Sequence, residues 1–474
     1  MIQIRLSKKI GYGFGDLGVS IAYFAVGFYF MYFLTDIVLL DPFLAGVAIF
    51  IGKLWDGINN PFMGIISDRT KSRFGRKRVY ILFGAIPFGL SFLILWFIPP
   101  GINQYIQFTL ATVAILIYAT TYSICVVPYM ALVPVMSKDY DERTQITGIR
   151  AILSTLGTIL GGTAALFISD FTDQILGLKI MGGSFAAFTI LTLIIAAISV
   201  KGIEPSTRRL VKDGVKLNED NEIDISSTTM ENSNDNEENY KIADFSAKQY
   251  ILILKDRNLL ILIAMKILGA VGTGILTSTL PYFAEYILGD EGVSTIGLAI
   301  YIGVSALILP VWNFFTKKFD KRRLMIIGIC GFAAVLIPIS FLITSGSTLI
   351  FYIGCGGLGI FMASYLLIPY SLVPDLVNSY EYKTGEKHES IIFGYWMSAH
   401  QLGIALGALI LGAFLKGFHY DANLPIQSSL AILGIRLAFG LLPAVFLILA
   451  IVALQFYKIT RLEYQKIIND NPSK

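Results

Sequence analysis

Four polar residues lie in the middle of an apolar segment near the start of the chain. The segment 43–67 is long enough to cross a bilayer, and it carries Lys53, Asp56, Asn59 and Asn60. At about 100° per residue, these side chains fall on one side of a helix. An ionised group at mid-bilayer is costly unless it faces a wet cavity or a partner. The segment therefore predicts a helix that lines a polar path through the membrane.

A carboxylate beside two amides has the chemistry of a monovalent-cation site. Na⁺ or Li⁺ prefers several hard oxygen ligands, and one carboxylate balances one positive charge. Asp56 could instead carry a proton through the transport cycle. A third interpretation is structural, with Lys53 as the permanent counter-ion of Asp56 inside the bundle. The residues alone leave these alternatives open.

The rest of the chain supplies the elements that must position these residues. The 474 residues are 55% hydrophobic, and the mean hydropathy is +0.68. Apolar runs of about 18–25 residues are long enough to span the hydrocarbon core. Twelve such runs begin near Gly11, Phe43, Val79, Tyr105, Ile146, Met181, Asn258, Thr295, Leu324, Leu349, Ser390 and Ser429. The sequence predicts an all-α integral membrane protein with twelve transmembrane helices.

Basic residues predict the orientation. Of the 37 Lys and Arg, only Lys179 and Lys416 fall in loops on the predicted outer side, which places both termini in the cytoplasm. The short loops favour a bacterial inner membrane, with a monomer in the lipid bilayer. We expect no metal site beyond a transported Na⁺ and no cofactor. The net charge of +4 reflects orientation, so no nucleic-acid partner is expected.

The twelve runs divide into two halves. Residues 204–247 are acidic and rich in Asn and Ser, a composition that cannot bury enough apolar surface to fold alone. We interpret them as a cytoplasmic linker, with a regulatory docking segment as the alternative. The predicted domains are a six-helix bundle at 1–203, the linker, a second six-helix bundle at 248–460 and a cytoplasmic tail at 461–474. Both halves carry a basic loop after their second run, which suggests an internal repeat with a central substrate site.

The first of these loops has a recognisable pattern. Gly64-x-x-x-Asp68-Arg69 is followed by Gly75-Arg76. This spacing resembles the loop signature of the major facilitator superfamily, and the resemblance implies the major facilitator fold. It also implies that these five residues form a cytoplasmic latch whose charges pair at a helix end. Ordinary positive-inside topology is the alternative.

Four further stretches narrow the resemblance. They are Tyr12–Asp16 with Tyr32–Asp36, Trp55–Gly64, Pro128–Pro134, and Glu381–Ser390. Together they resemble the glycoside–pentoside–hexuronide:cation symporter family, which includes melibiose permease and, more distantly, sodium-coupled lysolipid symporters. The resemblance covers nearly the whole chain except the linker.

The resemblance implies a coupling site. In this family the cation lies among acidic and amide residues of the second helix and a hydroxyl of the fourth. Asp56 and Asn59 match this pattern, and Ser123 stands at the hydroxyl position. Asn60 departs from it, because a second carboxylate is usual there. We expect Asp56, Asn59, Asn60 and Ser123 to bind the coupling ion, Na⁺ or H⁺.

The family's sugar site carries over less well. Its two acidic residues and its aromatic correspond here to Ser20, Val126 and Met130, whereas Arg150 matches an arginine. A sugar needs well-placed hydrogen-bond acceptors, so galactoside specificity is not expected. The remaining pocket suits a less hydroxylated, amphipathic or anionic solute. The predicted substrate-binding residues are Ser20, Tyr23, Tyr122, Val126, Met130, Arg150, Trp396, His400 and Gln401.

Each of these residues also has a structural interpretation. The aromatics could be helix-packing residues, His400 a hydrogen-bonded packing residue or a proton relay, and Arg150 part of a gate ion pair. Glu285, near the outer end of the seventh run, fits an interface position better than a ligand.

The leading hypothesis is a cation-coupled symporter of a glycoside, uronide or related solute that works by alternating access. The alternatives are a sodium-coupled carrier of lysolipids or other amphiphiles, and a sensor that binds without transport. No nucleophile–base set, zinc motif or nucleotide loop occurs in the sequence, so an enzyme is not expected.

Overall fold

The computed structural model describes residues 4–70, 72–137, 139–166, 173–203, 253–290, 292–384 and 389–457. The predicted linker 204–247 and tail 461–474 lie outside these residues. The predicted domain boundaries therefore remain predictions.

The first half of the chain forms one group of long helices. The long helices are α1 (Leu6–Tyr32), α2 (Pro42–Arg69), α3 (Arg78–Leu95), α4 (Gln104–Met130), α6 (Tyr140–Gly162) and α8 (Gln174–Ser199). Three short elements join them: the π-helix η1 (Phe33–Ile37), α5 (Val133–Met136) and the 3₁₀-helix η2 (Thr163–Ala165).

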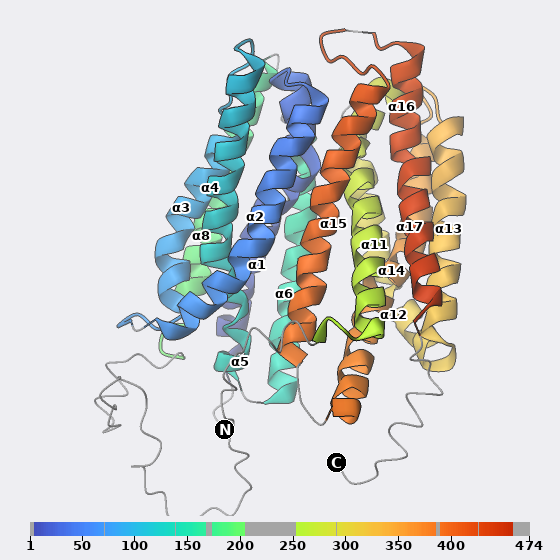
Figure 1. Ribbon diagram of the computed structural model, residues 1–474. Helices are drawn as coiled ribbons and strands as arrows, with labels where there is room; N and C mark the ends of the chain where they lie inside the picture. The colour runs from blue at the N-terminus through green and yellow to red at the C-terminus, as the bar shows by residue number, and fades with distance from the viewer. Residues whose placement is uncertain are drawn as a thin grey trace, which may run out of the picture.

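The second half forms the other group. It contains α11 (Arg257–Phe283), the π-helix η4 (Ala284–Leu288), α12 (Gly292–Lys318), α13 (Lys321–Leu342), α14 (Thr348–Thr384), α15 (Glu389–Gly417), α16 (Ser429–Phe439) and α17 (Leu441–Gln455). Because α16 and α17 join at Gly440, they make one span, Ser429–Gln455. The two groups stand side by side, and the start of α1 lies at the same end of the molecule as the end of α17 (Figure 1).

Ten of the spans in the described residues are apolar enough to cross a membrane by composition alone. The long helices α2 and α6 complete the predicted twelve. They fall short in hydropathy because they carry polar side chains, among them Lys53 and Asp56 on α2 and Arg150 on α6. A membrane helix with ionisable groups should face protein or water and not lipid. The two less apolar helices are therefore the ones expected to line the polar path.

Capping residues explain where many of these helices begin. A side-chain oxygen that accepts a hydrogen bond from a free backbone N–H satisfies the first turn of a helix. The residues that do so here are Asp41, Asn103, Asp139, Asp173, Asp256, Asp320 and Ser428.

The two groups meet along a narrow seam. Helix α2 packs along α15, α1 packs on α11, and α6 packs on α12. A Cβ atom on Gly412 would lie 2.3 Å from the carbonyl oxygen of Pro42, and one on Gly46 would lie 2.7 Å from that of Ala408. Small residues of this kind allow membrane helices to approach closely. The contact between α2 and α15 therefore depends on glycine.

Two local features repeat in both halves and support the predicted internal repeat. The first helix of each half ends in a π-helix, η1 after α1 and η4 after α11. The basic loop after the second helix also recurs, with Lys77 donating to the Ala131 carbonyl and Lys321 to the Ser371 carbonyl. These two lysine contacts reach corresponding helices of the two halves, because Ala131 follows the last residue of α4 and Ser371 lies on α14.

Candidate functional site

The Asp56 carboxylate lies at the seam between the two halves. Its side chain is on α2 and only 3% of the residue is exposed. Ser123 of α4 donates a hydrogen bond to its Oδ1 at 3.2 Å, and Gln401 of α15 donates to its Oδ2 at 3.0 Å. The predicted neighbour Ser123 is thus in contact with Asp56. Gln401, predicted to bind substrate, instead contacts the proposed coupling residue.

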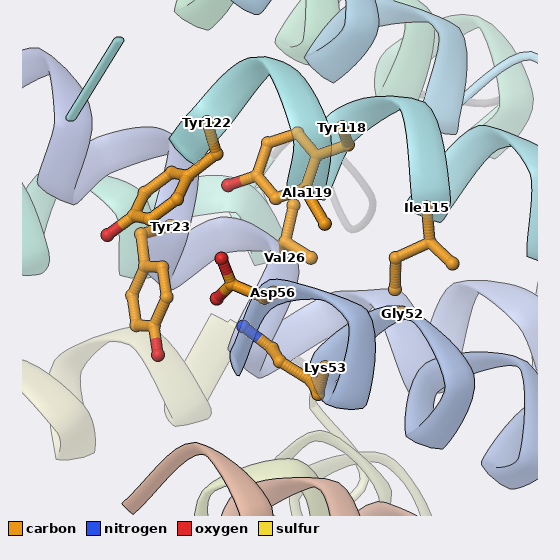
Figure 2. A pocket seen from close by; sticks show the side chains of 9 residues that line it. All are labelled: Tyr23, Val26, Gly52, Lys53, Asp56, Ile115, Tyr118, Ala119 and Tyr122. Atoms are coloured by element: carbon orange, nitrogen blue, oxygen red, sulfur yellow. The ribbon is translucent and has the colours of Figure 1, made fainter. Parts of the chain in front are cut away.

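A small cavity lies beside this carboxylate. The cavity volume is about 10 Å³, roughly the space that one water molecule needs. Its lining is Tyr23, Val26, Gly52, Lys53, Asp56, Ile115, Tyr118, Ala119 and Tyr122. Figure 2 shows the Asp56 carboxylate and the Lys53 ammonium close to each other, with the side chains of Tyr23, Tyr118 and Tyr122 beside them. The cavity has the size of a single small ion and does not hold a whole sugar.

Lys53 lies with Asp56 in the lining of this cavity and faces an aromatic ring. Among the described residues, no salt bridge joins it to Asp56. Its ammonium instead lies 4.2 Å from the centre of the Tyr23 ring. Electrostatic attraction to the ring face stabilises a desolvated ammonium. The hydrogen bonds of Ser123 and Gln401 to the two Asp56 oxygens come from neutral groups.

Several buried polar atoms near Asp56 have no hydrogen-bond partner. They are Asn59 Nδ2, Asn60 Oδ1, Tyr118 Oη and Gln401 Oε1. Leaving such groups unsatisfied costs about 1–3 kcal/mol each. Three of the four atoms are oxygens, the ligand type that a hard monovalent cation prefers. Asn59 and Asn60 do not line the cavity, so their predicted role as ligands is not established by the geometry.

The predicted substrate residues divide into two groups. Tyr23 and Tyr122 line the cavity together, with ring centres 5.6 Å apart. The Ser20 hydroxyl forms a hydrogen bond with the Ser154 hydroxyl of α6 at 2.8 Å. Val126 is 3% exposed and belongs to the packed core, whereas Met130 is 51% exposed at the end of α4. The structure therefore brings the tyrosines to the site but gives Val126 a packing role.

Arg150 has a fixed partner within its own half. Its guanidinium forms an ion pair with Asp16 of α1, and the rings of Tyr12 and Tyr129 lie 5.7 and 5.1 Å away. Tyr129 also donates a hydrogen bond to Asp16 at 3.0 Å. A guanidinium held in this way joins α1, α4 and α6. The arrangement supports a structural role, and because all partners lie in one half it is not a gate between the halves.

We expect Arg150→Lys to lower stability without removing solute binding. Lysine keeps the charge but loses the planar fork, so the apparent free energy of unfolding should fall by about 1–2 kcal/mol. Thermal unfolding in detergent measures this change. Arg73→Lys is the control, since Arg73 is exposed over the Phe74 ring and should change stability by less than about 0.5 kcal/mol. Loss of solute binding at unchanged stability would make Arg150 a substrate contact after all.

Trp396, one of the three predicted residues of α15, lies next to a charged group to which the sequence reasoning gave no role. Trp396 is 1% exposed, and its ring lies 4.9 Å from the ammonium of Lys266 on α11. Trp396 Nε1 and His400 Nδ1 are buried without partners. Sequence reasoning also missed Asp16 and Tyr118. The charged residues Asp16 and Lys266 carry the same signal that singled out Asp56, an ionisable group inside an apolar span.

The predicted latch is only partly formed. Asp68 pairs with Lys77 at 3.2 Å, and Lys77 also reaches the end of α4. Gly75 has a φ of 102°, a left-handed conformation that favours glycine in the turn. Arg69 and Arg76 are exposed, and a side chain at Gly64 would meet no atom within 4 Å. The positive charge that pairs with Asp68 is therefore Lys77, a residue of the same basic loop that was not among the five expected latch residues.

Comparison with known proteins gives consistent results. The chain matches the family described as MFS/sugar transport protein over residues 11–220 and 225–461. An uncharacterized symporter of Synechocystis sp. is 27% identical, with 97% of this chain and 95% of that protein covered. The sodium-dependent lysophosphatidylcholine symporter 1 of Gallus gallus is 24% identical (99% and 90% covered). A putative glycoside/cation symporter of Escherichia coli is 23% identical (97% and 93% covered).

Solved structures share the fold. A bacterial homolog of the human lysosomal transporter Spinster superposes with a TM-score of 0.68 at 12% identity, over 98% of this chain and 97% of that chain. The fold predicted from the sequence, two six-helix bundles of the major facilitator type, is confirmed.

Proposed function

Because the chain belongs to the MFS/sugar transport family, we propose that it is a multi-pass membrane symporter that couples a cation to a sugar-like solute. The family match agrees with the resemblance to glycoside–pentoside–hexuronide:cation symporters that the sequence motifs indicated. Relatives whose names describe them as symporters support coupled transport.

One observation carries the coupling mechanism. The hydrogen bond from Gln401 to Asp56 joins α15 of the second half to α2 of the first half. A cation that binds Asp56 competes with this bond, so ion occupancy changes the free energy of contact between the halves. A ligand shifts a conformational equilibrium only through its differential affinity for the two states. Asp56 lies where a small ion can have that effect.

The oxygen-rich surroundings of Asp56 favour Na⁺ as the coupling ion. Ser123 already contacts the carboxylate, and rotation of the Gln401 amide would turn its unpartnered Oε1 toward the same place. A proton needs only the carboxylate, which leaves the other oxygens without a role. The proposed coupling ion is therefore Na⁺. Uptake driven by a proton gradient would instead identify H⁺ as the coupling ion.

The proposed orientation follows the basic residues. With both termini in the cytoplasm of a bacterial inner membrane, the ends of α1 and α11 that carry η1 and η4 face outside. The protein is proposed to act as a monomer in the lipid bilayer. The solute is proposed to be a glycoside, uronide or related compound. A lysolipid or another amphiphile is the second candidate, favoured by the similarity to the lysophosphatidylcholine symporter.

Uptake into proteoliposomes tests the proposal. Radiolabelled glycosides, uronides and lysolipids are offered with an imposed Na⁺ gradient, an imposed proton gradient or neither. We expect accumulation above equilibrium of at least one sugar-like solute when the Na⁺ gradient is present, because downhill cation entry drives solute entry. Protein-free liposomes are the control. Solute binding or exchange that ignores both gradients would leave a facilitator or a sensor and contradict coupling.

A further inference from the structure

A buried lysine in the second half has no acidic partner within the part of the chain that the structure describes. Lys266 lies on α11 with only 4% of the residue exposed. Its ammonium faces three aromatic rings, at 5.6 Å from the centre of Tyr365, 5.2 Å from Tyr370 and 4.9 Å from Trp396. Among the described residues, neither a salt bridge nor a hydrogen bond of this ammonium is found. We call these four residues the Lys266 cage.

Two other cations of the described chain, Lys9 and Arg150, are paired with carboxylates, and a third, Lys53, has a carboxylate in the lining of the same cavity. Lys9 contacts Glu142 at 3.0 Å, and Arg150 pairs with Asp16. Lys53 lies with Asp56 in the lining of one cavity. An ammonium carries three donors, and ring faces satisfy its charge only in part. A desolvated charge at this depth in a membrane protein marks a functional group by default. The Lys266 cage therefore needs an anion to complete it.

The Lys266 cage lies beside the cation site. Trp396 is one helical turn before His400 and Gln401 on α15, and Gln401 bonds to Asp56. The cage and the Asp56 cavity thus belong to one polar region between the halves.

Unpartnered donors accompany the lysine. Trp396 Nε1 and Tyr365 Oη are buried without hydrogen-bond partners. The indole N–H can only donate, and the phenol can donate. An ammonium with two such neutral donors matches the acceptor-only chemistry of an oxyanion. A neutral sugar would leave the ammonium without a counter-charge.

The charges also explain why an anion should bind together with the cation. Asp56, Lys53 and Lys266 carry one negative and two positive formal charges, so the region is cationic before any ligand enters. A monovalent cation on Asp56 adds one more positive charge. Like charges in a low-dielectric region repel strongly, and an anionic solute relieves this repulsion. Each ligand therefore favours the binding of the other.

We propose that Lys266 binds a carboxylate or phosphate group of the transported solute, whose body packs against Tyr370 and Trp396. This inference rests on the proposed function and specifies its substrate class as anionic. Lys266 is then a specificity-determining residue of the second half, and Asp56 is the ion site of the first half.

Equilibrium binding in detergent tests the inference without requiring transport. The probes are 4-nitrophenyl β-D-glucuronide, the neutral 4-nitrophenyl β-D-glucoside and 4-nitrophenyl phosphate, measured by calorimetry with Na⁺ present. We expect the wild-type protein to bind one of the two anions at least about 10-fold more tightly than the glucoside, because a charge-assisted contact is lost with the neutral probe. The stronger anion distinguishes a carboxylate site from a phosphate site.

Two variants assign the preference to the lysine. Lys266→Met should reduce the anion-to-glucoside affinity ratio to about 1, and Lys266→Arg should retain most of it. Lys179→Met is the matched control, because Lys179 also lies over a ring, that of Phe97 at 5.3 Å, but on α8. If Lys266→Met does not fold, Lys266→Gln replaces it, and an anion preference that survives in Lys266→Gln overturns the role of Lys266.

The inference and the proposed function can fail separately. Equal wild-type affinities for the three probes, absence of binding, or an anion preference that survives in Lys266→Met would each overturn the role of Lys266. None of these results depends on a gradient. Conversely, an anion preference that requires Lys266 stands even if gradients fail to drive uptake, in which case the protein is an anion-binding facilitator or sensor.

Discussion

Asp56→Asn should abolish Na⁺-driven accumulation while leaving a folded protein that still exchanges solute. Asparagine has the same shape, and its oxygen can still accept a hydrogen bond from Ser123 or Gln401. What disappears is the formal negative charge of the carboxylate beside the cavity. Removing this charge from a partly desolvated site should weaken monovalent-cation binding by about 3 kcal/mol or more, which is roughly 100-fold or more.

The measurement compares two modes of transport in the same proteoliposomes. Gradient-driven uptake should be lost in Asp56→Asn, whereas exchange of internal for external solute, which needs no net cation movement, should persist. Asp173→Asn is the matched control, because Asp173 caps α8 and asparagine is an equally good cap. Accumulation that survives in Asp56→Asn would place the coupling ion elsewhere.

Asn60→Asp offers a complementary change in the same helix. It supplies the second carboxylate that the family pattern has at this position. The unpartnered Asn60 Oδ1 shows that an oxygen is already present and buried there. A second negative charge should tighten cation binding, so the Na⁺ concentration for half-maximal uptake should fall. This tighter cation binding should depend on Asp56, so Asn60→Asp should give no Na⁺-driven uptake when it is combined with Asp56→Asn.

Asp36→Ala should open the seam at the end of the molecule opposite the start of α1 and the end of α17. Asp36 lies in η1, and its carboxylate accepts hydrogen bonds from Thr35 at 2.6 Å, from Tyr286 at 2.7 Å and from Tyr420. The two tyrosines belong to the second half, so one carboxylate joins both halves at this end. Hydrogen bonds to a charged group are worth about 1.5–3 kcal/mol each. Losing them should favour the outward-open state by about 2–4 kcal/mol, allowing for new bonds with water.

Cysteine accessibility from outside measures this opening. Gly27 is a suitable reporter position, because it is exposed on α1 and a Cβ there meets no atom within 4 Å. In a background without the native Cys125, Cys330 and Cys355, Gly27→Cys should react with a membrane-impermeant maleimide at least about 10-fold faster when Asp36→Ala is also present.

A second contact between the halves provides the control for Asp36. Lys416 pairs with Asp41 at 2.9 Å, but its side chain is 56% exposed. Exposed ion pairs contribute about 0–1 kcal/mol, so Lys416→Met should change the labelling rate only slightly. Equal labelling in Asp36→Ala and the parent protein would show that the three hydrogen bonds do not hold this end closed.

The sequence by itself determined the membrane spans and singled out Asp56. Both conclusions depend on local quantities: the length of an apolar run, and the cost of an ionisable residue within it. A helix period and a positive-inside bias need no knowledge of distant residues. For this reason the twelve spans and the buried carboxylate on α2 were predictable.

The partners of each charged group were decided only by the tertiary structure. Gln401 and Asp56 are 345 residues apart in the chain, and Arg150 and Asp16 are 134 residues apart. Sequence reasoning therefore considered Arg150 for the substrate and Lys53 as the counter-ion of Asp56. Which side chains meet depends on how whole helices rotate and pack, because a rotation of one residue moves a side chain by about 100°.

The Lys266 cage shows the same limit most clearly. Its rings come from α14 and α15 and its ammonium from α11, so no local sequence pattern predicts the cage. The sequence contained the charged residue in an apolar span, but it could not show that the residue lacks an acidic partner. Only the packing of three helices decides whether a buried charge is neutralised, and that packing distinguishes Lys266 from Arg150.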